Sequence, residues 1–242
     1  MNLDYPIIVL GNGGYKKLYV ENTLLSFKKA VEVGADGVNL CVWVSKESSI
    51  VVNHDKFVED NEGRIIEIKE LDYKTIKKIK LPMKQHIPTL EMVINELPED
   101  TLINVKVNEF EAIENTLRII KSFSAIERIL ISSENKDILK KFREKEKDLF
   151  LGYYLNKKED VENIFSINSE IGLYSANIPM EGILFYGLEN YKNFASRVKE
   201  ENMKIFIKGL NDTNYIAILK GYYDVIVTEY IEDVISQLQK TF

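Results

Sequence analysis

Short apolar runs alternate with longer amphipathic stretches through most of the chain. The runs are rich in Val, Ile and Leu and have the length of buried strands; they occupy Ile7–Leu10, Gly37–Val42, Leu102–Val107, Ile129–Ser132, Phe150–Leu155, Leu173–Ile178, Lys204–Ile207 and Asp224–Thr228. Helical spacing of apolar residues follows in the stretches between them, as in Glu21–Val33, Glu109–Phe123, Lys136–Lys145, Tyr191–Asn202 and Asp212–Lys220. A repeated strand-then-helix order predicts a parallel sheet with right-handed crossovers.

The number of these units points to a barrel. Eight strand runs in 242 residues fit a single α/β domain, residues 1–242, folded as a closed (β/α)8 TIM barrel. A doubly wound open sheet has the same alternation and is the alternative. Because both folds occur at this length, length does not separate them.

One stretch breaks the alternation after the second predicted strand. The polar sequence Val44–Ser49 predicts a hairpin turn that returns the chain antiparallel as Ile50–Asn53. A polar excursion and a helical pattern near Leu71–Ile79 follow, and Thr89 is placed to cap the next helix. We therefore expect residues 45–88 to form a small insertion over the mouth of the barrel.

Composition narrows the class of protein. With 45% apolar and 29% charged residues the chain is globular, neither disordered nor a disulfide scaffold. No apolar run is long enough to span a membrane, and residues 1–6 lack the pattern of a signal peptide. A single cysteine, Cys41, indicates a reducing cytoplasm. A net charge of −6 without a basic stripe argues against nucleic-acid binding.

Polar residues at the carboxyl ends of the predicted strands are the candidates for chemistry, because the active sites of TIM barrels lie there. Asn39 and Cys41 are two residues apart and share one face of their strand. Lys106 and Asn108 share a face of the next barrel strand in the same way. The full set is Gly11–Gly14, Asn39, Cys41, Lys106, Asn108, Ser132–Glu134, Lys208 and Thr228–Glu229.

The glycines of Gly11–Gly14 follow the first strand, as those of a dinucleotide-binding loop do. They lack the G-x-G-x-x-G spacing, and no acidic residue follows the second strand where it would bind a ribose. A flexible loop is the simpler interpretation.

The order of motifs resembles that of the glycerophosphodiester phosphodiesterase family, whose members are (β/α)8 barrels with a small insertion after strand two. The resemblance runs nearly from end to end. Glu21–Leu24 carries the family's Glu-Asn-Thr signature unchanged, and Gly34–Val42 resembles its Gly-Ala-Asp-Gly strand. The other matching segments are Ile8–Tyr15, Val51–Asp55, Ile87–Glu91, Ile103–Asn108, Lys208–Asp212 and Thr228–Glu229, each without a gap.

The resemblance also implies a catalytic set, and most of that set is substituted here. Family enzymes use two histidines as acid and base, an arginine and a lysine on the phosphate, and three carboxylates around a Mg²⁺ or Ca²⁺ ion. Of these seven positions only the second histidine is kept, as His54. The substituted positions are Asn12 for the first histidine, Gly13 for the arginine, Asn39, Cys41 and Lys106 for the carboxylates, and Asn108 for the lysine.

These substitutions remove the metal and the proton relay. Mg²⁺ and Ca²⁺ require hard anionic oxygen ligands, and Lys106 would place an ammonium where the ion should sit. We therefore expect no metal and no other cofactor. Asn12 does not exchange a proton near pH 7, and each acid–base group is worth about 10²–10⁴-fold in rate. We expect a catalytically inactive or strongly impaired relative, with His86 in a surface or packing role.

A positive pocket remains possible without the ion. In the family the carboxylates, the dication, the arginine and the lysine sum to one positive charge, and Lys106 supplies the same charge here. Lys208 adds a second cation if its strand places it inward, and Glu21 of the unchanged signature belongs to the same candidate set, with His54 nearby. Lys106, Lys208 and Glu21 predict a site for a small phosphate-bearing or other anionic ligand. In the alternative, Lys106 reaches solvent or pairs with Glu134 or Glu229.

Two active alternatives stay open. One is phosphodiester hydrolysis on glycerophosphodiesters, part of lipid metabolism, that uses His54 and needs no metal. The other is new chemistry by a thiolate–imidazole–carboxylate set of Cys41, His54 and Asp55, with the thiol pKa lowered by Lys106. Against the second, a lone cysteine on a strand usually packs as a small apolar residue.

Overall fold

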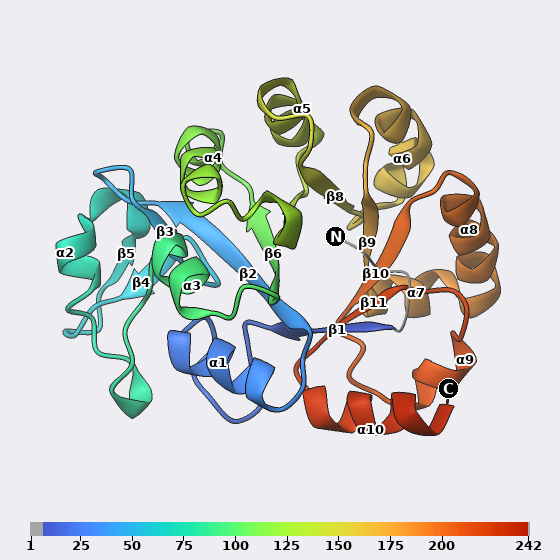
Figure 1. The fold of residues 1–242 in the computed structure, drawn as a ribbon, viewed down its shortest axis with the longest axis horizontal. Helices are drawn as coiled ribbons and strands as arrows, with labels where there is room; N and C mark the ends of the chain where they lie inside the picture. The colour runs from blue at the N-terminus through green and yellow to red at the C-terminus, as the bar shows by residue number, and fades with distance from the viewer. Residues whose placement is uncertain (1–6, 242) are drawn as a thin grey trace.

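Eight parallel strands pair side by side into a closed ring in the computed structural model, which describes residues 7–241 (Figure 1). Each barrel strand pairs with the next barrel strand along the chain. The first and last barrel strands also pair, so the ring has no open edge. The barrel strands are β1 (Ile8–Asn12), β2 (Gly37–Val44), β6 (Leu102–Val107), β7 (Ile129–Ser133), β8 (Phe150–Tyr154), β9 (Ser175–Pro179), β10 (Lys204–Lys208) and β11 (Val225–Thr228). The predicted TIM barrel is confirmed, and the open-sheet alternative is wrong.

Helices follow the strands and cover the outside of the ring (Figure 1). The predicted helix Glu21–Val33 begins later, because the Thr23 side chain accepts from the Ser26 amide and caps the first turn. Thr89 caps its helix as predicted, through the Met92 amide. The helices are α1 (Leu24–Glu32), α3 (Leu90–Glu96), α4 (Ala112–Ser122), α5 (Lys136–Lys145), α6 (Lys158–Ile171), α7 (Met180–Tyr186), α8 (Leu188–Glu200), α9 (Asn214–Ile218) and α10 (Ile231–Thr241).

The segment after β2 makes its own small unit. The predicted hairpin is confirmed, since β3 (Ile50–Val52) pairs antiparallel with the end of β2. The hairpin of β4 (Phe57–Glu59) with β5 (Ile65–Glu67) and the short helix α2 (Tyr73–Ile76) follow, at one side of the ring in Figure 1. A separate apolar cluster holds this unit together, made of Val51, Val58, Ile68, Ile76, Ile79 and Ile87.

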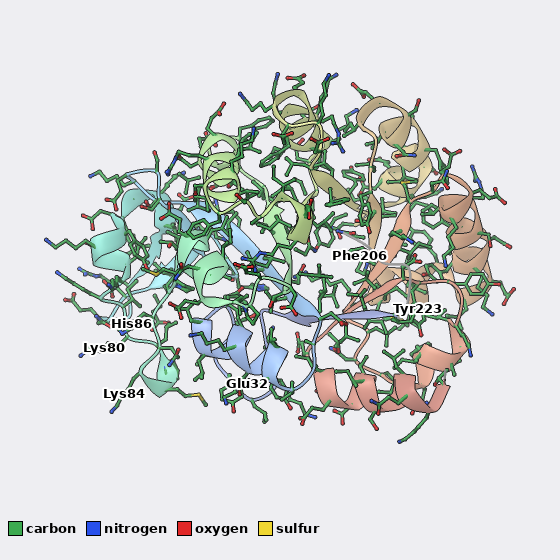
Figure 2. The ribbon with its side chains drawn as sticks, viewed as in Figure 1. Glu32, Lys80, Lys84, His86, Phe206 and Tyr223 are labelled. Carbon is green, nitrogen blue, oxygen red and sulfur yellow. The ribbon has the colours of Figure 1, made fainter. Side chains whose placement is uncertain are left out.

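The interior of the barrel is layered. Its lower layer, toward the amino-terminal ends of the strands, is apolar and includes Leu10, Leu130 and Phe206. Of these residues, Figure 2 labels Phe206. Successive inward positions lie two residues apart on a strand. The layer above therefore comes from residues such as Asn39 and Asn104, which are buried and polar. The change from apolar to polar inside one barrel marks the end that carries the candidate site.

Two predictions from the sequence concerned a signal peptide and membrane-spanning segments. Residues 1–6, on which the absence of a signal peptide was predicted, lie outside the described residues. Among helices of residues 7–241, none combines the length and the apolar character needed to cross a bilayer.

Gly37 provides a test of the barrel packing. A Cβ added there would lie 2.0 Å from the Leu102 carbonyl oxygen of the neighbouring strand, so Gly37→Ala must push two paired strands apart. We expect a loss of about 3 kcal/mol in the free energy of unfolding. The matched control is Gly182→Ala, where the new Cβ meets nothing nearer than 3.4 Å. Denaturant unfolding followed by circular dichroism checks both, and equal midpoints for the two variants would contradict the packing described here.

Candidate functional site at the barrel mouth

The loop after β1 is packed closely against the start of α1. Gly13 and Gly14 have φ of +67° and +84°, a conformation that favours glycine. The Gly13 amide donates to the Asn39 carbonyl at 2.8 Å, and the Gly13 carbonyl accepts from the Ser26 hydroxyl at 3.0 Å. A Cβ on Gly14 would lie 2.5 Å from the same Ser26 oxygen. The glycines thus serve close packing beneath the mouth.

The unchanged Glu21-Asn22-Thr23 signature has a structural role in two of its three residues. Asn22 adopts a left-handed conformation with φ of +56°, and its amide donates to the Gly13 carbonyl at 2.9 Å. Thr23 caps α1 and donates its hydroxyl to the Val20 carbonyl at 2.7 Å. Only Glu21 points its functional group at the mouth, where its carboxylate faces other charged groups.

Asn39 is the centre of a buried hydrogen-bond network that joins four strands. Its Nδ2 donates to Asn12 Oδ1 at 3.0 Å. Its Oδ1 accepts from Asn104 Nδ2 at 2.7 Å and from the Tyr154 hydroxyl at 3.2 Å. Burial raises the pKa of Tyr154, so the phenol stays protonated and acts as a donor. Strands β1, β2, β6 and β8 therefore meet at one uncharged amide.

The three positions that correspond to metal ligands do not form a site for a hard dication. The side-chain oxygen of Asn39, Oδ1, already accepts hydrogen bonds from two donors. Cys41 offers a soft sulfur, and Lys106 a positive charge. Across residues 7–241, no group of three or more His, Cys, Asp or Glu side chains is placed to hold a metal ion. No catalytic step through a metal follows from this arrangement.

Lys106 is paired within the site. Its ammonium forms a salt bridge with Glu134, which follows β7, and lies 4.9 Å from the centre of the Tyr154 ring. Its side chain is only 14% exposed, so the pairing takes place in a partly desolvated setting. The sequence left two predictions for Lys106, a free charge for a ligand or a pair with an acidic residue. The structure shows the pair, with Glu134, and this weakens the prediction of a free charge.

Lys208 is the second cation, and it points inward from the end of β10. Its ammonium lies 5.7 Å from the centre of the same Tyr154 ring. Burial, and then the nearby charge of Lys106, lower the pKa of Lys208. Within the part of the chain that the structure describes, no carboxylate forms a salt bridge with it. The site therefore keeps one cation without an ionic partner.

Cys41 lies beside Lys106 in the pairing of β2 with β6. Burial raises the pKa of its thiol, and the charges of Lys106 and Lys208 offset only part of that effect. The prediction of a lowered thiol pKa is wrong, because the strand pattern did not reveal how far the sulfur is withdrawn from water. The ring of His54 faces Glu21 instead of the thiol. The nucleophilic set of Cys41, His54 and Asp55 therefore lacks an activated nucleophile.

His54 lies at the rim, with 53% of its side chain exposed. Its Nδ1 is 3.6 Å from Glu21, which also pairs with Lys16 at 3.3 Å. Lys16 in turn is 3.3 Å from Glu229, so the rim carries a row of alternating charges. The other histidine, His86, is exposed at the outer edge of the inserted unit, where Figure 2 shows it near Lys80 and Lys84.

Asn108 lies one residue beyond the end of β6, where the alternation of the strand no longer applies. Strand β6 ends at Val107, and the side-chain oxygen Oδ1 of Asn108 accepts from the Ser133 hydroxyl at 3.2 Å and the Glu134 backbone amide at 3.4 Å. It therefore fixes the turn between β7 and α5. That turn carries the carboxylate that neutralises Lys106.

Sequence reasoning missed two members of the site, Asn104 and Tyr154. Both occupy inward positions of their strands, and an aromatic residue with a polar tip at such a position was an available signal. Two kinds of alignment linked them to Asn39: the register of the paired strands β2 and β6 for Asn104, and the approach of the non-adjacent strand β8 across the barrel for Tyr154. The periodicity of one strand supplies neither.

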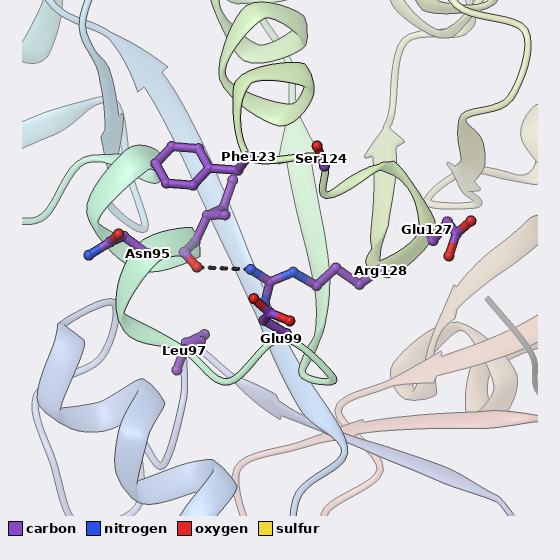
Figure 3. Close-up of a pocket in the computed structure, with 8 residues that line it drawn as sticks. Asn95, Leu97, Glu99, Phe123, Ser124, Glu127 and Arg128 are labelled. Carbon is purple, nitrogen blue, oxygen red and sulfur yellow. Dashed lines mark hydrogen bonds between the residues drawn. The ribbon is translucent and has the colours of Figure 1, made fainter.

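A hollow at the opposite end of the barrel has a structural explanation (Figure 3). It measures about 350 Å³ and lies between the ends of α3 and α4. The Arg128 guanidinium donates to the carbonyls of Pro98 and Ile94 at 2.7 and 2.9 Å. The charge is thus used to satisfy one carbonyl in the last turn of α3 and one just beyond its end.

Comparison with known proteins confirms the family resemblance. The model of the glycerophosphoryl diester phosphodiesterase family matches residues 13–232. A glycerophosphodiester phosphodiesterase of Caldanaerobacter subterraneus subsp. tengcongensis is 33% identical over 141 residues, which are 53% of this chain and 58% of that protein. A lysophospholipase D of Mus musculus is 24% identical over 57% of this chain and 48% of its own. The chain thus spans about half the length of these curated relatives.

Solved structures agree over nearly the whole chain. The glycerophosphodiester phosphodiesterase of Thermotoga maritima superposes with a TM-score of 0.82 at 28% identity, covering 96% of this chain and 98% of that one. A phosphodiesterase of Oleispira antarctica, solved with the product sn-glycerol-3-phosphate, has a TM-score of 0.83 at 18% identity and covers 96% of both chains. At 18% identity, the comparison with the Oleispira antarctica protein shows a shared fold and no more.

The single cysteine gives a direct readout of the site. Because the thiol pKa is raised, we expect labelling of Cys41 by a disulfide reagent to be slow at pH 7 and to accelerate only in the alkaline range. Lys106→Met should move the midpoint of the pH–rate profile further upward, since that charge lowers the thiol pKa. The surface variant Lys17→Met is the control. A rate that is already maximal at pH 7 would contradict a buried neutral thiol.

Proposed function

The chain belongs to the glycerophosphoryl diester phosphodiesterase family, and we propose from this premise that it is a catalytically inactive or strongly impaired member. In this proposal its barrel mouth binds a small phosphate-bearing ligand without a metal ion. The protein works as a binding or regulatory member of a family whose named relatives act in phosphodiester and lysophospholipid chemistry.

The bonding of Asn39 carries the proposal. An amide whose oxygen already accepts from Asn104 and Tyr154 contributes neither charge nor a spare lone pair of suitable direction to an ion. The two remaining ligand positions, Cys41 and Lys106, add a neutral thiol and a cation. Metal charge neutralisation is worth several kcal/mol in phosphoryl chemistry, and this site lacks the groups that would supply it.

The acid–base pair is also incomplete. Asn12 is an amide whose Oδ1 accepts from Asn39 at 3.0 Å, and it neither gains nor loses a proton near neutral pH. His54 remains, but it is half exposed and faces Glu21. Loss of one acid–base partner alone costs about 10²–10⁴-fold in rate.

Lys208 supports the binding part of the proposal. It is partly buried, it points into the mouth, and it lacks a described ionic partner, whereas Lys106 is neutralised by Glu134. A phosphate monoester would pair with the Lys208 ammonium and thereby raise its pKa. The Tyr154 ring beneath both lysines provides a rigid floor.

Hydrolysis remains as a second candidate function because of one contact. Glu21 lies 3.6 Å from His54 Nδ1, and a carboxylate that closes this gap to hydrogen-bond distance would orient the imidazole as a general base. In this version His54 activates water for slow, metal-independent cleavage of a glycerophosphodiester, with the Lys208 charge on the phosphate. A cytoplasmic location and a place in lipid metabolism belong to the same proposal and rest on the single cysteine and the family.

The first test is hydrolysis of glycerophosphodiesters by the natural protein with Mg²⁺, Ca²⁺, Mn²⁺ and with chelator. We expect turnover within about 10²-fold of the uncatalysed rate and no dependence on metal, because the ion-binding carboxylates are absent. Metal-dependent turnover would overturn the proposal. Slow activity that chelator leaves unchanged and that His54→Ala abolishes would establish the second candidate.

A variant with restored family residues separates lost chemistry from a lost scaffold. It carries Asn12→His, Gly13→Arg, Asn39→Glu, Cys41→Asp, Lys106→Glu and Asn108→Lys. Its thermal melt is measured first, because Gly13 has φ of +67° and removal of Lys106 leaves Glu134 unpaired. Metal-dependent activity that appears only in a folded restored variant would attribute the loss to these positions.

Ligand binding is tested with glycerol 3-phosphate and with inorganic phosphate by calorimetry in the absence of metal. We expect Lys208→Met to weaken binding by roughly ten- to a hundredfold, the value of a charge-assisted hydrogen bond. The control Lys17→Met removes an exposed lysine that is paired with Asp233 and should leave binding unchanged. Equal effects of the two variants, or no binding by the natural protein, would contradict the site.

A further inference from the structure

Three consecutive large apolar side chains protrude at the end of α7. Leu184 is 48% exposed, Phe185 84% and Tyr186 39%. The rings of Phe185 and Tyr186 meet edge to face at 5.2 Å. Single exposed apolar residues are common on protein surfaces, but a contiguous group with a nearly bare phenyl ring usually marks a contact surface.

An apolar pocket opens directly beside this protrusion. It has a volume of about 200 Å³ and lies between α6, α7 and the first turns of α8. Tyr186 belongs to both features, since it is part of the exposed group and also lines the pocket. Its other walls are mainly apolar, with Val161, Ile183 and Phe194 among the lining side chains, and Gly182 of α7 lies at its edge.

The pocket has the size and character to take one phenyl ring. An apolar cavity of about 150 Å³ is large enough to bind benzene. Phe185 does not fill the pocket next to it, because its own ring is 84% exposed. One surface therefore presents a phenyl ring and, next to it, a place where such a ring fits.

We infer that this surface is a self-association site, in which a second copy of this chain inserts its Phe185 into the α7 pocket and receives the first copy's Phe185 in return. An isologous two-fold contact requires a patch that is complementary to itself. An adjacent ring and pocket meet that requirement. The inference is independent of the proposed function, since none of these residues lines the barrel mouth described above.

The area available indicates a reversible dimer. Aromatic side chains bury about 150–250 Å² each, so two copies of Phe185 and Tyr186 account for roughly half to most of the 1,200 Å² at the lower end of stable interfaces. Both aromatics are already partly covered in the monomer, which reduces that contribution. Leu184 and the pocket walls supply the remainder.

Charges near the patch favour a second copy over an anionic membrane. Both signs occur there, with Lys192 paired to Glu189 at 3.3 Å and Arg197 stacked over Phe165 at 4.5 Å. No basic cluster borders the pocket among the described residues, and the chain carries a net charge of −6. An acidic protein is repelled by an anionic bilayer, whereas a patch of mixed charge does not repel its own copy.

Sedimentation velocity over a wide range of protein concentration tests the inference with two complementary variants. Phe185→Ser removes the inserted ring, and Gly182→Leu fills the pocket from α7, where an added Cβ has no neighbour nearer than 3.4 Å. We expect the natural chain to dimerise reversibly and each variant to raise the dissociation constant about thirtyfold or more, as for a hot-spot residue. The control Phe110→Ser removes a ring that is 49% exposed elsewhere and should leave dimerisation unchanged.

A mixture of the two variants separates self-association from other occupants. In the mixed dimer the intact Phe185 of the Gly182→Leu chain can enter the open pocket of the Phe185→Ser chain. We expect this heterodimer to form more tightly than either variant homodimer and less tightly than the natural dimer. A natural chain that stays monomeric would overturn the inference. Binding to phosphatidylcholine or phosphatidylglycerol vesicles that depends on Phe185, without dimers in solution, would overturn it in favour of a lipid surface.

Discussion

The mouth of this barrel depends on the side-chain amide of Asn39. Because it is 2% exposed, each of its polar atoms must find a partner inside the protein. It does so by donating to Asn12 and accepting from Asn104 and Tyr154. A carboxylate at this place would accept three bonds but donate none, and it would need a cation to offset its burial. An amide closes the same network without charge.

An uncharged amide at position 39 affects the charges that the neighbouring side chains can carry. Three carboxylates crowded at one mouth repel one another unless a dication lies between them. Here the corresponding side chains are an amide, a thiol held neutral by burial, and a lysine whose partner Glu134 comes from the turn after the next barrel strand. The group balances internally, so the substitutions at Asn39, Cys41 and Lys106 form one consistent set. Restoring a single carboxylate would disturb that balance.

The motifs that the chain shares with its family and those it has changed differ in physical role. Thr23 caps α1 and Asn22 holds the loop after β1, so the unchanged signature largely describes the scaffold. Asn12, Asn39 and Lys106 face into the mouth, and there the family residues are replaced. A sequence can therefore retain a fold while the groups that gave the fold its chemistry are exchanged.

Much of the fold followed from the sequence because strand and helix periodicities are local properties. The barrel strands and the hairpin to β3 were predicted from them, and alternation correctly placed Asn39 on the inward face.

Relations between strands were not local. The partners Asn104 and Tyr154 depend on alignment around the ring, and the raised pKa of Cys41 depends on burial by neighbouring elements. Alternation did not fix the direction of Asn108, because this residue follows the end of its strand. The exposed Phe185 also escaped the pattern, since helical spacing alone does not show which face of α7 lacks a covering element. Contacts between elements thus decide which polar residues become a site, and the same holds for the surface at which two copies of this chain would meet.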